Sequence, residues 1–162
     1  MMPYITLKKI DAKDQIALSH ILLDPQIRLT YMLPKLTEET SLELAKRIIS
    51  MSNDGSRYVR GIYLEEELVG FLNETDNANN EIELGWVVAT AYQSKGICTQ
   101  AVKIAIVDLF KAGYHTVIAG AFECNPASIR VMEKVGMTRL QRKEIIHYND
   151  VDHNCIFYGI CP

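Results

Sequence analysis

Residues 92–101 read Y-Q-S-K-G-I-C-T-Q-A, and this stretch decides the fold because an extended apolar run ends before it and a long helical pattern follows it. The first turn of a helix has backbone N–H groups without intrahelical partners, and the helix dipole adds partial positive charge there. Gly96 lets the backbone approach a ligand closely, and Lys95 adds a formal positive charge. We interpret the stretch as a phosphate-binding turn; the alternative is an ordinary strand-to-helix turn capped by Ser94.

The length and composition of the chain are those of one globular domain. It has 162 residues, of which 48% are hydrophobic and 23% charged, so disordered and fibrous classes are excluded. The net charge of -3 comes from residues spread along the chain, and we therefore expect no nucleic-acid partner. The first residues lack the features of a signal peptide, and no apolar run reaches the ~18 residues of a membrane span. We expect a cytoplasmic protein with no membrane partner.

Cysteine and histidine spacing does not suggest a metal site. The four cysteines are widely separated, with no C-x-x-C pair, and the four histidines lack the i, i+4 spacing of ligands on a helix. We therefore expect reduced thiols and no bound metal. The cysteines are Cys98, Cys124, Cys155 and Cys161.

Apolar periodicity and turn residues divide the chain into alternating strands and helices. Strands are predicted at residues 5–10, 57–64, 68–74, 81–89, 116–122, 138–148 and 153–161. Helices are predicted at residues 11–23, 37–52, 101–113 and 127–135. Asp24 and Pro25 are expected to end the first helix, and residues 76–80 to form a turn.

The middle of the chain predicts a β-α-β unit. The strand at 81–89, the phosphate-binding turn, the helix after it and the strand at 116–122 require a parallel, right-handed crossover. The last two strands, joined by Asn149 and Asp150, are typical of a closing hairpin. The order of elements predicts an α/β fold with a mixed sheet and helices on both faces.

Two motifs in this order resemble the GCN5-related N-acetyltransferase superfamily, in its branch of ribosomal-protein alanine N-acetyltransferases. E-L-G-W-V-V-A-T-A-Y-Q-S-K-G-I-C-T-Q-A, residues 83–101, is similar to the family's strand and Q/R-x-x-G-x-G/A pyrophosphate loop. N-P-A-S-I-R-V-M-E-K-V-G-M, residues 125–137, is similar to its coenzyme A-binding helix. The resemblance implies a single domain over residues 1–162, with a mixed, mostly antiparallel, twisted sheet of about seven strands flanked by about four helices.

The resemblance also implies acetyl-CoA as cosubstrate. Its pyrophosphate would lie on the amides of residues 94–99, and its pantetheine arm would pair with the strand near Val88. Cys98 stands where the family most often has Gly or Ala, but it is still small. The residues expected to bind the cosubstrate are Val88, Gln93, Ser94, Lys95, Gly96, Ile97, Cys98, Thr99, Asn125 and Ser128.

For catalysis, the resemblance implies few side chains, because a thioester is already activated. Glu83 is the first candidate for the base that takes the proton of the amine; Glu81, a water chain, or no catalytic role for either carboxylate stay open. The backbone N–H of Val88 is the candidate donor to the thioester oxygen. The helix lacks the tyrosine that other branches use as acid, which favours Ser128 for protonating or stabilising the departing thiolate. Two roles stay open for Asn125, a hydrogen bond to the pantetheine or an ordered water and capping of its helix, and they do not exclude each other.

The expected function is transfer of an acetyl group to a primary amine of a protein N-terminus or a small molecule, by direct attack on the thioester. Two alternatives are a coenzyme A-binding sensor or scaffold without turnover and an unrelated phosphate-binding α/β domain. Residues 24–36, which are expected to shape the acceptor cleft, contain no recognisable acceptor motif. Acceptor identity and a homodimer stay open.

Overall fold

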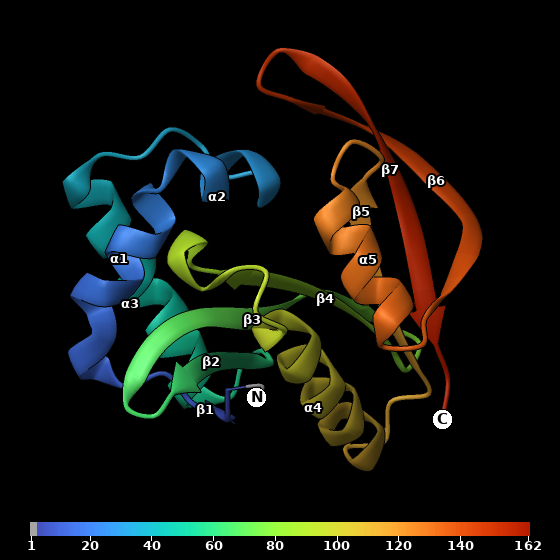
Figure 1. Cartoon of the computed structure of the whole chain (residues 1–162), viewed down its shortest axis with the longest axis horizontal. Helices are drawn as coiled ribbons and strands as arrows, with labels where there is room; N and C mark the ends of the chain where they lie inside the picture. The colour runs from blue at the N-terminus through green and yellow to red at the C-terminus, as the bar shows by residue number, and fades with distance from the viewer. Residues whose placement is uncertain (1–2) are drawn as a thin grey trace. The chain divides into compact units, whose positions relative to one another are not determined.

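The computed structural model describes residues 3–162 (Figure 1). The contacts within the chain separate it into two units. The first unit contains the chain up to Glu74 and residues 86–101; the second contains Thr75–Gly85 and Val102–Pro162. Strands β3 (Glu67–Ala78) and β4 (Glu81–Val88) and helix α4 (Ile97–Lys111) each continue from one unit into the other. The expected single domain stays a prediction.

Seven strands form one hydrogen-bonded sheet in the order β1-β2-β3-β4-β5-β7-β6. The pair of β4 and β5 is parallel, whereas β1 with β2, β2 with β3, β5 with β7 and β6 with β7 are antiparallel. The mixed α/β fold and the parallel crossover are thereby confirmed. The other strands are β1 (Ile5–Lys8), β2 (Val59–Leu64), β5 (Thr116–Phe122), β6 (Thr138–Tyr148) and β7 (Val151–Ile160).

The first unit places α1 (Gln15–Leu23) against α3 (Glu38–Asp54) over a core that includes Leu18, Ile48 and Phe71. Thr37 begins α3 through a reciprocal capping box with Thr40. Gly55 ends it in the left-handed conformation, with φ 73°. These local signals are those from which the helix was predicted.

One helix of the first unit was missed. Asp24 and Pro25 end α1 as predicted, but they also begin α2 (Pro25–Thr30). The carboxylate of Asp24 accepts from the Gln26 N–H at 2.9 Å, and Pro25 occupies the first helical position, where its fixed φ suits a helix. After α2, Tyr31 donates its hydroxyl to Asn73 of β3 and packs edge-on against Phe71. This packing explains why so short a helix is stable.

Strand β3 is longer than predicted because its turn is shorter. Residues 76–80 were expected to form a turn, but the strand continues to Ala78. Only Asn79 and Asn80 make the turn, with φ values of 56° and 62°. Asparagine tolerates the left-handed conformation, so two residues are enough to reverse the chain.

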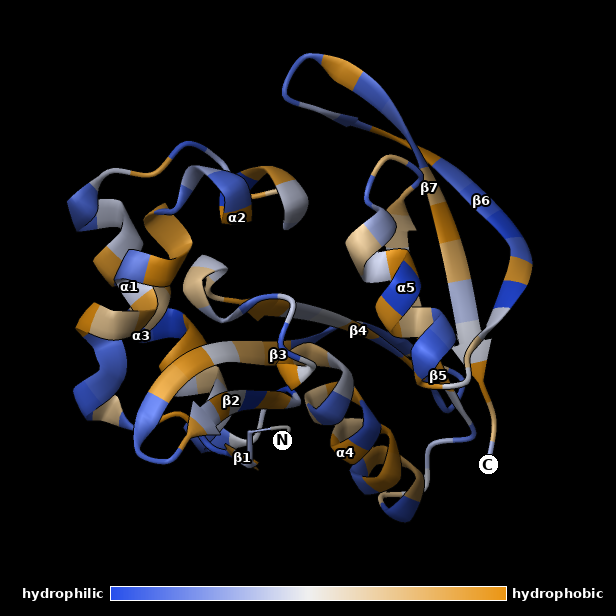
Figure 2. Cartoon of the chain, in the orientation of Figure 1, coloured by the Kyte–Doolittle hydropathy of each residue, from blue (hydrophilic) through white to orange (hydrophobic). Residues whose placement is uncertain are grey.

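The second unit contains the closing hairpin of β6 and β7 together with α5 (Pro126–Lys134). The predicted hairpin is confirmed, with Asn149 and Asp150 at φ 54° and 61°. Figure 2 shows that β6 is largely hydrophilic in its middle, whereas the second half of β7 is apolar. This difference follows from their places in the sheet, because β6 is an edge strand and β7 lies between β5 and β6.

Candidate functional site

In the first unit, the predicted phosphate-binding turn leads directly into α4. The 3-10 turn η2 (Thr90–Tyr92) is followed by Ser94 at φ 62° and Gly96 at φ 78°, and α4 begins at Ile97. Left-handed residues in a turn give the backbone form from which anion-binding nests are made. The next backbone N–H groups belong to the first turn of α4, where the helix dipole favours an anion.

A buried donor lies on the same helical turn. The side-chain Nε2 of Gln100 is buried and meets no hydrogen-bond acceptor within residues 3–162. Leaving such a donor unsatisfied costs about 1–3 kcal/mol, which a polar ligand can offset. Gln100 was not predicted as a site residue from the sequence.

Cys98 behaves as a small apolar side chain in this turn. Burial raises the pKa of its thiol to about 12, so the sulfur is neutral at pH 7. A neutral thiol brings no negative charge beside the N-terminus of α4. The residue is therefore compatible with the anion site that the sequence predicts.

Two contacts fix the end of β4. One is made by the Val88 carbonyl and the other by the peptide that joins Val87 to Val88. The Gln93 side-chain Nε2 donates to the Val88 carbonyl at 2.9 Å, which ties the turn to the strand. The Val87 carbonyl oxygen lies against Gly70 of β3, where a Cβ on Gly70 would stand only 2.2 Å from it. The Val87 oxygen and the Val88 N–H belong to one trans peptide and point in opposite directions. The contact with Gly70 therefore directs the Val88 N–H away from β3.

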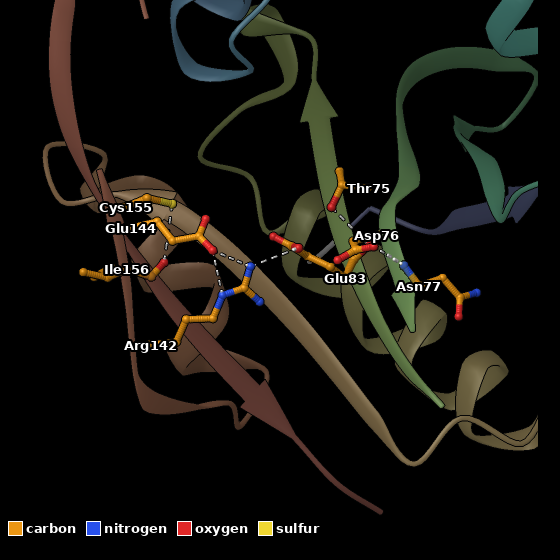
Figure 3. A network of polar contacts seen from close by, with 8 residues as sticks. All are labelled: Thr75, Asp76, Asn77, Glu83, Arg142, Glu144, Cys155 and Ile156. Carbon is orange, nitrogen blue, oxygen red and sulfur yellow. Dashed lines mark hydrogen bonds and ion pairs between the residues drawn. The ribbon is translucent and has the colours of Figure 1, made fainter. Parts of the chain in front are cut away.

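In the second unit, Glu83 of β4 is the most enclosed carboxylate of a polar network (Figure 3). Its side chain is 19% exposed, and Oε2 lies 4.0 Å from the Arg142 guanidinium. Burial raises the pKa of Glu83; Arg142 opposes this, whereas the negative charges of Asp76 and Glu144 add to it. A carboxylate with a raised pKa is better matched to accepting a proton near neutral pH. Glu81, in contrast, is exposed.

Asn125 and Ser128 are brought together at the start of α5. The Ser128 N–H donates to Asn125 Oδ1 at 3.3 Å, and Asn125 Nδ2 donates to Ser128 Oγ at 3.2 Å. The helix-capping role of Asn125 is thereby confirmed. Because Ser128 Oγ accepts from Asn125, its own hydroxyl proton is still available for donation.

Arg142, Glu144 and Gly70 were missed by the sequence reasoning. Arg142 and Glu144 lie far along the chain from Glu83, and no local periodicity links these positions. Gly70 had a weak signal, since a glycine inside a strand often marks a close backbone approach.

Neither a metal cluster nor a membrane-spanning helix is present in the part of the chain that the structure describes. No three His, Cys, Asp or Glu side chains gather there as ligands of an ion would. No helix within residues 3–162 is long and apolar enough to cross a membrane.

Several solved structures share this fold. An acetyltransferase of the GNAT family from Bacillus anthracis has 25% identity and a TM-score of 0.84, covering 99% of this chain and 98% of that chain. The ribosomal-protein-S5-alanine acetyltransferase from Vibrio fischeri has 16% identity and a TM-score of 0.80, with 99% and 94% covered. Spermidine N-acetyltransferase from Vibrio cholerae, in complex with CoA and spermine, has 14% identity and a TM-score of 0.82, with 97% and 95% covered.

One of two comparisons at the level of sequence supports this likeness. A search of curated proteins yields no significant match. The model of the acetyltransferase (GNAT) domain matches residues 5–138, which is most of the chain and includes both motifs up to the start of β6. The chain therefore belongs to the GNAT acetyltransferase family and is an N-acetyltransferase of the kind that uses acetyl-CoA.

Proposed function

We propose that this protein transfers the acetyl group of acetyl-CoA to the primary amine of a protein N-terminus or of a small molecule, by direct attack of the amine on the thioester. The observation that carries the proposal is the left-handed turn at Ser94 and Gly96, followed at once by the N-terminus of α4. It offers backbone donors and a helix dipole to a pyrophosphate, in a chain of the GNAT family.

Each residue that is proposed to bind acetyl-CoA has its own role. Backbone N–H groups from Ser94 to Thr99 hold the pyrophosphate, with the Lys95 ammonium as an added charge. Gln93 holds the turn to Val88 through its side chain, so its contribution is the shape of the turn. Asn125 orients Ser128 at the start of α5.

When bound, acetyl-CoA supplies an activated acyl group, so the protein has to position the amine and manage protons. Glu83 accepts the proton that the amine must lose, and its raised pKa suits this role. The Val88 N–H donates to the thioester oxygen as negative charge develops there. The Ser128 hydroxyl donates a hydrogen bond that stabilises the departing thiolate, which takes its proton from solvent while Glu83 returns its own proton to solvent.

The acceptor class rests on the chemistry of the site and on the relatives. A carboxylate base serves any primary amine, because each must lose a proton as it attacks. One relative is described as a ribosomal-protein-S5-alanine acetyltransferase and another as a spermidine N-acetyltransferase. These names support primary amines as a class for this chain without choosing among them.

The test is a thiol-release assay with acetyl-CoA and a panel of peptides with free N-termini, polyamines and amino acids. We expect free thiol only when an amine is present, with an N-acetylated product visible by mass spectrometry. Acetyl-CoA at 100 times its Kd should stabilise the fold by about 2.7 kcal/mol, with ATP as the comparison ligand. Stabilisation without thiol release would instead favour a sensor, and equal stabilisation by ATP would contradict coenzyme A specificity.

A further inference from the structure

The Arg142 guanidinium is shared unequally between two carboxylates (Figure 3). Its Nε and NH2 groups donate to one oxygen of Glu144 at 3.2 and 2.9 Å. The same NH2 group lies 4.0 Å from Glu83, beyond hydrogen-bond distance. Arg142 therefore interacts more strongly with Glu144 than with the more enclosed Glu83.

The fold fixes this arrangement through the backbone of β6. Arg139 pairs with Tyr158, but Lys143 pairs with Ile156, so β6 contains extra residues between these positions. Arg142 belongs to this irregular segment, and such bulges redirect side chains. Its guanidinium lies 3.9 Å from the centre of the Phe157 ring on β7. This contact restricts how far the cation can move.

Gly120 of β5 makes room for the Phe157 ring against which the Arg142 guanidinium packs. A Cβ on Gly120 would stand 2.6 Å from Phe157 Cε1. The two residues are direct partners in the sheet. A glycine at this position therefore leaves room for the ring that the Arg142 guanidinium contacts.

We propose that Arg142 and Glu144 are positioning residues that set the basicity of Glu83, with Glu144 holding the guanidinium away from the Glu83 carboxylate. The proposal rests on the proposed role of Glu83 as base. A closer Arg142 would make Glu83 a weaker base, because a nearby cation stabilises the charged carboxylate. The partial pairing keeps Glu83 available to take a proton from an amine.

The other groups that face Glu83 do not replace this effect. Asp76 of β3 adds negative charge, which acts in the same direction as Glu144. Cys155 of β7 has its thiol pKa raised by burial to about 11, so it is neutral near pH 7. Among these described neighbours, Arg142 alone lowers the pKa of Glu83.

Two substitutions should move the titration of Glu83 in opposite directions. Glu144→Gln removes a negative charge and loosens the hold on Arg142, so the pKa of Glu83 should fall. Arg142→Gln removes the cation, so that pKa should rise. The measurement is the pH titration of side-chain carboxyl carbons by NMR in the full-length protein without acetyl-CoA, with the Glu83 signal assigned by its loss in Glu83→Gln.

Activity provides a second readout. With a peptide acceptor, kcat/KM should rise with pH as the α-amine deprotonates, and the rise should be steeper below the pKa of the base. At one pH unit below the pKa that the NMR titration gives for wild-type Glu83, the ratio of kcat/KM to its value at pH 8 should be higher than in the wild type for Glu144→Gln and lower for Arg142→Gln, each by roughly two- to fivefold. This size follows from the modest strength of half-exposed ion pairs, since Arg142 and Glu144 are 40% and 46% exposed.

The controls are Lys143→Gln, which removes a cation from the same strand, and Asp150→Asn, which removes an anion from the hairpin turn. Neither should move the Glu83 titration, because neither side chain is among the charged groups that act on Glu83, which are Arg142, Asp76 and Glu144. Shifts of the same sign in Glu144→Gln and Arg142→Gln, or none, would overturn the inference. Opposite NMR shifts with an unchanged kcat/KM profile would support the effect of Arg142 and Glu144 on the pKa of Glu83. The same result would reject Glu83 as the catalytic base.

Discussion

Gly70 is a residue whose absent side chain fixes the position of a backbone donor. The Val87 oxygen occupies the space of its missing Cβ, and a Cβ would also stand 3.0 Å from the Val88 Cα. Contacts this short to backbone cannot be relieved by turning a side chain, so the peptide itself would have to move. The Val88 N–H would then change its direction, because it belongs to that peptide.

Gly70→Ala should therefore lower kcat more than it weakens acetyl-CoA binding. The expected loss in kcat is up to about 100-fold, the size reported for displacements of catalytic groups by about 1 Å. Steady-state kinetics and a direct binding measurement by calorimetry check the split. The matched control is Gly159→Ala on β7, where a Cβ would lie 3.3 Å from the flexible end of Leu140. Wild-type kcat in a folded Gly70→Ala protein would reject the role of the Val88 peptide.

The protonation state of Glu83 should affect the stability of the fold as well as turnover. Burial raises its pKa above the ordinary value of 4.5, so folding favours the protonated form. Its contribution to the unfolding free energy is full below pH 4.5 and is lost as pH rises through the folded-state pKa. A neutral side chain at this position would avoid that loss.

Glu83→Gln should therefore reduce turnover by about 100-fold or more. The difference in Tm between this variant and the wild type should grow in favour of the variant as the pH rises from 4.5 to 8. The measurements are kcat and thermal unfolding across this pH range. Glu81→Gln is the control, since Glu81 lies on the same face of β4 but is exposed. A lower Tm at every pH would mean that Glu83 serves mainly as an ion-pair partner of Arg142.

At the scale of elements, the junction of η2 and α4 concentrates the donor-binding features. Gly96 has φ 78° and Gly55, at the end of α3, has φ 73°, so alanine is strained at both by roughly 1–2 kcal/mol. The two glycines differ in their place in the chain: Gly96 lies in the predicted phosphate-binding turn, whereas Gly55 ends α3, where a Cβ would meet no described atom within 4 Å. They form a matched pair in which only one substitution affects the phosphate-binding turn.

Gly96→Ala should weaken acetyl-CoA binding about tenfold or more, which corresponds to 1.4 kcal/mol. Gly55→Ala should lose a similar amount of stability and keep its affinity. Calorimetric binding and chemical unfolding of both variants separate the two effects. Equal affinities in the two variants would show that the turn at Gly96 does not approach the ligand.

At the scale of the whole molecule, the two units share elements along the chain. β3, β4 and α4 each begin in one unit and end in the other. In the second unit, β5 pairs with the part of β4 at residues 81–83. Unfolding of one unit would therefore break hydrogen bonds in elements that the other unit needs.

We expect one cooperative unfolding transition for the whole chain. In differential scanning calorimetry, the calorimetric and van't Hoff enthalpies should agree. Acetyl-CoA should move this single transition to higher temperature rather than split it. Two separate transitions would contradict the single domain predicted over residues 1–162.

Features set by neighbouring residues could be predicted from the sequence, whereas features set by residues distant along the chain could not. Turns at Gly55 and at Asn149 and Asp150 were predictable, because a left-handed turn needs residues that tolerate it. The helix α2 was not, because Asp24 and Pro25 favour both the end of one helix and the start of another. Its stability depends on Tyr31 packing against β3, which is distant in sequence.

The sequence by itself determined the family and, apart from α2, the order of the strands and helices along the chain, because periodicity, caps and short motifs act over neighbouring residues. The phosphate-binding role of the turn before α4 stays a prediction. Only the tertiary structure decided that Gly70 holds the Val87–Val88 peptide and that Arg142 is shared between Glu83 and Glu144. These contacts join residues far apart along the chain. Their distances and burial, which set the direction of an N–H or the pKa of a carboxylate, arise only when the sheet is assembled.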